Sequence, residues 1–108
     1  MKCTAVRESI LIKDNMDYTI LSTDPTYILT GTTQLTTFRI FTLPLANACT
    51  GKRFVIKDQG MVNSGNVISI VRSGSDTIEG GTTIFINSAW GSQDLISTGT
   101  NWIRLNSQ

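Results

Sequence analysis

The chain contains no histidine among its 108 residues. Histidine is the commonest general base near neutral pH and the commonest metal ligand. Its absence excludes serine–histidine and cysteine–histidine nucleophile systems built within one chain. Two cysteines without histidine also cannot complete a tetrahedral zinc site in one subunit. We therefore expect a protein that is not an enzyme and that has no metal site and no cofactor.

Charged residues are also scarce, at 16% of the chain with a net charge of +1. No basic cluster is longer than the pair Lys52-Arg53, so nucleic-acid binding through phosphate contacts has little support. Apolar runs are too short for a transmembrane helix, which predicts no membrane insertion. The segment Met1–Glu8 lacks the apolar region of a signal peptide. We therefore expect a protein that stays in the cytoplasm of the cell that makes it.

Cysteine is limited to Cys3 and Cys49, too few for a disulfide framework. Two reduced thiols are the main expectation. A Cys3–Cys49 bridge and an intermolecular bridge remain open as alternatives.

Short strands separated by Gly, Asn and Asp turns account for almost the whole chain. The length fits one domain, and helical periodicity is confined to a single turn at Leu45–Cys49 between Pro44 and Gly51. The pattern predicts an all-β fold, a small antiparallel, jelly-roll-like β-sandwich. Residues 1–32 are interpreted as N-terminal strands or a linker of the domain, and residues 33–108 as its main module. The predicted strands are about Ser9–Lys13, Asp17–Ser22, Tyr27–Thr30, Gln34–Leu43, Arg53–Asp58, Val67–Arg72, Thr77–Glu79, Thr82–Asn87, Asp94–Ser97 and Asn101–Leu105.

The alternation of side chains along the strands predicts which face of each strand is buried. The residues predicted to form the core are Phe54, Ile56, Ile68, Ile70, Ile84, Ile86 and Trp102. The opposite positions are not uniformly polar, since they include Val55, Val67, Val71 and Phe85. A sheet with one face in water shows cleaner alternation. These residues therefore predict a buried contact with neighbouring subunits, while scattered apolar surface residues are the alternative.

Four residues are candidates for ligand binding. Asp76 and Glu79 flank Thr77-Ile78 in a Gly-rich turn, where two carboxylates could serve a glycosidase or a calcium site. The simpler interpretation is that Asp76 caps the turn and Glu79 is solvated. Trp90 lies in a Ser/Gly-flanked loop and could stack on a sugar ring, or else plug the loop or contact a subunit. Tyr27 is the fourth candidate, on the expectation that a receptor-binding protein exposes it.

The order of short sequence motifs between Leu35 and Leu105 resembles that of a known family. The motifs are Thr42-Leu43-Pro44, Ala46–Cys49, Gly51, Ile56-Lys57-Asp58, Ile68–Ile70, Gly74–Gly80, Leu95–Ser97 and Gly99–Trp102. They resemble a module near the C-terminal ends of phage tail fibres and other viral fibre or spike proteins.

The resemblance implies a small β-module at the distal part of a trimeric viral fibre, with no catalytic residue. We accordingly expect a homotrimeric virion protein that is made in the host cytoplasm and mediates host attachment. Its expected partners are other virion proteins and a host-surface glycan or receptor. Two alternatives are a trimerisation or capsid-decoration module without receptor binding, and a carbohydrate-binding domain.

Overall fold

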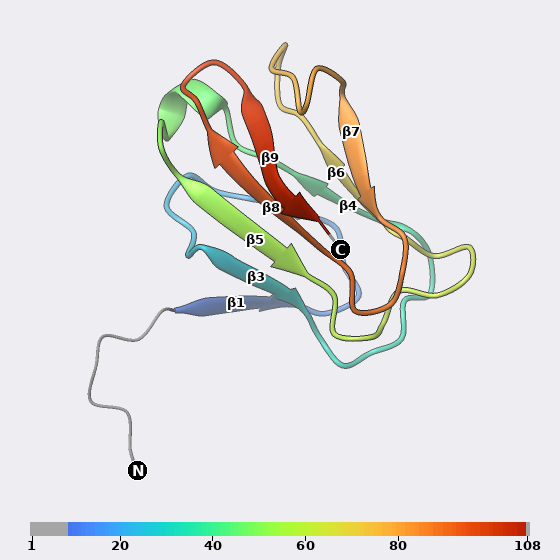
Figure 1. The fold of residues 1–108 in the computed structure, drawn as a ribbon. Coiled ribbons are helices and arrows are strands. Elements are labelled where there is room, and N and C mark those ends of the chain that lie inside the picture. Colours follow the sequence, from blue (N-terminus) through green and yellow to red (C-terminus); the bar gives the residue numbers. More distant parts are fainter. Residues whose placement is uncertain (1–8, 108) are drawn as a thin grey trace.

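The computed structural model describes residues 9–107, which form nine strands and one short 3₁₀ helix (Figure 1). The elements are β1 (Ile10–Lys13), β2 (Tyr18–Thr19), β3 (Tyr27–Thr30), β4 (Arg39–Thr42), η1 (Ala46–Ala48), β5 (Arg53–Lys57), β6 (Ile68–Val71), β7 (Thr83–Ile86), β8 (Ser92–Ser97) and β9 (Trp102–Ser107). The all-β prediction is confirmed. No helix in this part of the chain is long and apolar enough to cross a membrane.

The strands form two sheets. Sheet A has five strands in the order β1-β3-β5-β8-β9, and sheet B has four in the order β2-β4-β6-β7 (Figure 1). From β1 to β6 the chain passes alternately between the two sheets. Each time the chain crosses to the other sheet and returns, it adds the next strand to each sheet. The path from β1 to β6 is therefore a winding of successive coils, which we call the coil stack.

Both sheets are mixed, so the prediction of an antiparallel sandwich is wrong in this respect. Four of the seven strand pairs between residues 9 and 107 are parallel, namely β1–β3, β3–β5, β2–β4 and β4–β6. The cause is the winding: a chain that crosses to the other sheet and returns runs in its original direction again. This connectivity also departs from a jelly roll, whose strands are antiparallel.

The C-terminal strands pair differently from the wound ones. β7 follows β6 in sheet B, and β9 follows β8 in sheet A, each as an antiparallel neighbour. The predicted hairpin at Gly99-Thr100-Asn101 joins β8 to β9, and Gly99 has the positive φ of 96° that such a turn requires. β8 also pairs antiparallel with β5. The parallel winding thus ends on the C-terminal side, where the antiparallel strands β7 and β9 form the sheet edges.

One apolar core lies between the sheets. All seven residues predicted as core are buried, and Trp102 and Phe54 contact each other with ring centroids 5.7 Å apart. Ile20 and Ile28, from the N-terminal segment, belong to the same cluster. That segment supplies β1 and β3 to sheet A and β2 to sheet B.

The observed elements differ from the predicted ones mainly at their ends. The expected strand at Thr77–Glu79 is reduced to isolated bridges from Ile78 to Gly81 and Trp102. The predicted helical turn is present as η1. Cys49 has a free thiol whose pKa is raised chiefly by partial burial. Cys3, and with it the proposed bridge, lies outside the described residues.

Candidate functional site

The four candidate residues do not form one site. Trp90 precedes β8, and Asp58 donates its N–H to the carbonyl of the neighbouring Gly91, so the Trp90 loop lies at the start of β8. Trp102 donates its N–H to the carbonyl of Thr77, and Trp102 pairs with Ser97 at the opposite end of β8. At about 3.3 Å per residue, these two ends of β8 are separated by roughly 17 Å. Asp76 and Glu79 therefore lie far from Trp90.

Trp90 is largely exposed, with 62% of its surface accessible. Its φ is +68°, in the left-handed region that bulky residues rarely adopt. Such strain persists only where the surroundings enforce it, and it is common at binding sites. Two contacts hold this backbone: Trp90 N donates to Asp58 Oδ2 at 3.0 Å, and Lys57 Nζ donates to the Trp90 carbonyl.

Asp58 is the anchor of this loop. It follows β5, is completely buried, and accepts five hydrogen bonds. Its donors are the Thr30 hydroxyl and the backbone N–H groups of Gly60, Met61, Val62 and Trp90, at 2.9–3.1 Å. A buried carboxylate is stable only when its oxygens are satisfied in this way. Asp58 thus ties the segment after β5 and the segment before β8 into one rigid unit.

Gly60 completes the arrangement around Trp90. A methyl group at Gly60 would lie 2.7 Å from Cζ2 and 2.8 Å from Cε2 of the indole. The ring therefore packs directly on the Gly60 backbone, which only glycine permits at this distance. One face of the indole is covered by Gly60, and the side chain remains largely in solvent. The sequence pattern identified Trp90 as a loop aromatic but did not identify Lys57, Asp58 or Gly60 as its supports.

Asp76 and Glu79 have structural partners. Asp76 Oδ2 accepts the N–H of Ala46 at 2.8 Å, at the start of η1. Glu79 Oε2 accepts the N–H of Arg104 at 2.8 Å, and its φ of +52° places it in the Gly-rich turn. The two carboxylates therefore each accept a backbone donor. Between residues 9 and 107, no group of three or more acidic or cysteine side chains is arranged to hold a metal ion.

Tyr27 lies on the outward side of sheet A rather than near Trp90. It is half-buried at the start of β3, between Ile10 of β1 and Val55 of β5. Its neighbours define an apolar surface that crosses all five strands, which we call the sheet A outer face. Along each strand the members of this face alternate with residues that point into the core. Its apolar and aromatic members are Ile10, Ile12, Tyr27, Leu29, Val55, Ile96 and Ile103.

An ion pair lies within this surface. Arg53 and Asp94 contact each other at 2.6 Å between Nη2 and Oδ2, and Arg53 Nε donates to Oδ1 at 2.8 Å. This bidentate pairing raises the pKa of Arg53, chiefly through the hydrogen bond to Asp94. The pair satisfies both charges within one chain.

The four residues predicted to contact neighbouring subunits lie on different surfaces of the chain. Val55 belongs to the sheet A outer face, whereas Val71 and Phe85 lie on the outward side of sheet B. Val67 precedes β6 and packs against the core. No single outer face therefore contains all four residues, and their predicted contact with neighbouring subunits stays a prediction. Alternation within a strand shows that a position faces outward but not which of two sheets contains it.

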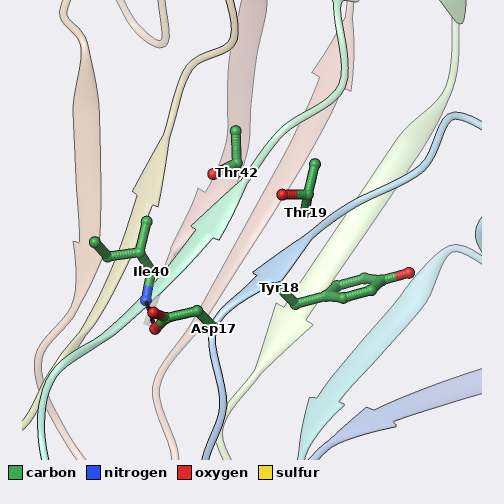
Figure 2. A pocket seen from close by; sticks show the side chains of 5 residues that line it. All are labelled: Asp17, Tyr18, Thr19, Ile40 and Thr42. Atoms are coloured by element: carbon green, nitrogen blue, oxygen red, sulfur yellow. Dashed lines mark hydrogen bonds between the residues drawn. The ribbon is translucent and has the colours of Figure 1, made fainter.

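A groove of about 270 Å³ lies between β2 and β4, lined by Asp17, Tyr18, Thr19, Ile40 and Thr42 (Figure 2). The carboxylate of Asp17 in this groove already forms a hydrogen bond, because its Oδ1 accepts the N–H of Ile40 at 2.9 Å. The groove is smaller than the 300–1,000 Å³ typical of small-molecule sites. We therefore regard Trp90 and the sheet A outer face as the better candidates for function.

No protein-family model matches this chain, and no curated protein sequence matches it either.

Proposed function

We propose that this chain is a non-enzymatic virion structural protein, the head or distal module of a homotrimeric viral fibre or tail fibre that mediates host attachment. The observation that carries the proposal is the apolar sheet A outer face. A face of this kind marks a protein interface when it is contiguous and exposed. The resemblance of the short sequence motifs to those of viral fibre modules supports the same role.

The chemistry of this face suits contact with further copies of the chain. Closed cyclic symmetry is the usual arrangement of homo-oligomers, and a threefold ring is the form that the fibre resemblance implies. The Arg53–Asp94 pair lies on the same face and is already bidentate. A neighbouring subunit can therefore cover this pair without leaving either of its two charges unpaired. Lys57, on the same side of β5, donates a hydrogen bond from its ammonium group to the Trp90 carbonyl.

The two ends of the coil stack support a distal position in a fibre. Sheet A ends at β1 on the N-terminal side, where parallel pairing is open to continuation. On the other side the winding ends in the antiparallel hairpins β6–β7 and β8–β9, whose outer strands β7 and β9 are also sheet edges. The parallel winding can therefore be extended only from the β1 side, which suits a module at the distal end of an elongated assembly.

Light scattering tests the assembly. At micromolar concentration the purified protein should have about three times the chain mass of 11.8 kDa. Ile103→Lys, on the sheet A outer face, should lower the mass to that of one chain, because it places a charge in the interface. Phe85→Lys is the control, since Phe85 is similarly exposed but lies on sheet B. A monomeric wild-type protein, or equal effects of both variants, would contradict the proposed interface.

The exposure of Trp90 distinguishes the alternatives. A trimerisation or capsid-decoration module has no need of an exposed, strained aromatic loop, so this feature favours display to a ligand. A carbohydrate-binding role is the second candidate, and the Trp90–Gly60 contact favours it. Tyr27 is proposed to contribute to the subunit interface instead.

A further inference from the structure

We propose that the outer face of the Trp90 indole is a saccharide-binding platform that stacks on a pyranose ring. The inference deepens the proposed attachment role by naming its ligand class, and it rests on that role for its biological setting. The platform itself is built within one chain. Its parts are an exposed ring, a glycine beneath it and a buried carboxylate that fixes the backbone.

The ring is held in place before any ligand arrives. Gly60 supports one face, and the loop backbone is fixed by Asp58 and Lys57. A pre-organised aromatic contributes more to affinity, because little side-chain entropy is lost on binding. The strained φ of Trp90 requires such support, and an unconstrained surface loop would relax it.

The surroundings favour a sugar over a lipid or an apolar peptide. A pyranose offers one face of C–H groups for an aromatic ring and a rim of hydroxyl groups for polar neighbours. The segment around Trp90 carries polar side chains, since Asn87 and Ser88 are exposed and Ser92 is half-buried, so hydrogen-bonding groups lie close to the indole along the chain. A lipid surface or an apolar helix would instead need a broad, continuous apolar area.

Fluorescence gives a direct test, because the chain has two tryptophans and Trp102 is fully buried. Quenching by acrylamide therefore reports Trp90. The purified chain is titrated with maltoheptaose, chitohexaose and an oligogalacturonate. We expect at least one of these to protect Trp90 from acrylamide. Trp90→Ala should weaken its binding, measured by calorimetry, about tenfold or more, as loss of an aromatic anchor does. Trp90→Phe should retain part of the affinity.

Gly60→Ala tests the geometry with a matched control. The new methyl group must displace the indole, so binding should weaken. Gly65 has a nearly identical φ, +86° against +88°, but nothing lies within 4 Å of a methyl group there. Gly65→Ala therefore introduces similar backbone strain without touching the ring, and binding should be unchanged. Equal losses in both variants would overturn the proposed geometry.

The remaining outcomes separate this inference from the fibre proposal. A trimer that binds none of the three saccharides overturns the platform and leaves the fibre proposal standing. A monomer that binds one of them through Trp90 contradicts the fibre assembly and supports the platform. Protection of Trp90 by a proline decapeptide or by anionic lipid vesicles, with no saccharide active, would also overturn the platform.

Discussion

Asp58→Asn should be one of the most destabilising isosteric changes in this chain. The carboxylate is buried and accepts five hydrogen bonds, two at Oδ1 and three at Oδ2. An amide keeps the shape but replaces one acceptor oxygen with an NH₂ donor. In its better orientation the NH₂ group takes the Oδ1 position and faces the Met61 N–H and the Thr30 hydroxyl. The Met61 N–H and the Thr30 O–H would then both lose the oxygen that accepts them. The Thr30 hydroxyl also accepts the N–H of Gln59 at 2.7 Å, which holds it in this position.

The cost follows from the bonds lost. A hydrogen bond to a charged group contributes about 1.5–3 kcal/mol, so losing two should lower the free energy of unfolding by about 3–6 kcal/mol. That is a large share of the total stability of about 5–15 kcal/mol typical of a domain. The loss should appear in urea unfolding followed by the fluorescence of buried Trp102, at a fixed protein concentration.

Asp17→Asn is the matched control for this experiment. It makes the same chemical change at an exposed carboxylate outside the proposed interface, where Oδ1 accepts one N–H, that of Ile40, and an amide oxygen can still accept it. Its effect should be much smaller than that of Asp58→Asn. If Asp58→Asn costs less than about 1 kcal/mol, the carboxylate does not anchor the loop as argued. The support assigned to Trp90 would then be wrong as well.

Three further predictions concern the core, a titrating group and catalysis. Ile70→Ala should cost about 2–5 kcal/mol in urea unfolding because it leaves a cavity, whereas Leu21→Ala, at an exposed position outside the proposed interface, should cost far less. Burial, and then a hydrogen bond to a carboxylate, raise the pKa of Tyr18 to about 12. The stability this provides should be complete below pH 10 and lost between pH 10 and about 12. Tyr18→Phe should abolish that loss in alkaline unfolding curves. Incubation with polysaccharides should release no reducing ends, and turnover that disappears in Asp76→Asn or Glu79→Gln would refute this.

Strand positions and the core were accessible from the sequence because period-two alternation is a local signal. Phe54 and Ile56, for example, point inward as predicted. The parallel winding could not be predicted from the sequence. The direction of a strand relative to its neighbours depends on which sheet each strand joins. Two strands joined by a loop can pair with each other or lie in opposite sheets, and the alternation of side chains is the same in both cases.

The candidate site was only partly predictable for a similar reason. Trp90 stands out as a loop aromatic between small residues, but its support comes from a segment thirty residues earlier in the chain. The signal available for Asp58 was its position directly after an apolar strand and before Gln59-Gly60. The sheet A outer face combines one or two residues from each of five strands, so no local window of sequence contains it.

The alternating path of the chain has a consequence for how it folds. The hairpins β6–β7 and β8–β9 join strands that are adjacent in sequence, whereas pairs such as Ile10–Tyr27 and Arg39–Ile68 require long loops to close. Loop closure costs more entropy as the loop lengthens, and distant pairings slow folding. The C-terminal hairpins should therefore nucleate first, with the earlier strands added onto them in reverse order. During synthesis the N-terminal strands leave the ribosome before their nucleus exists, so productive folding has to wait until β8 and β9 have been made.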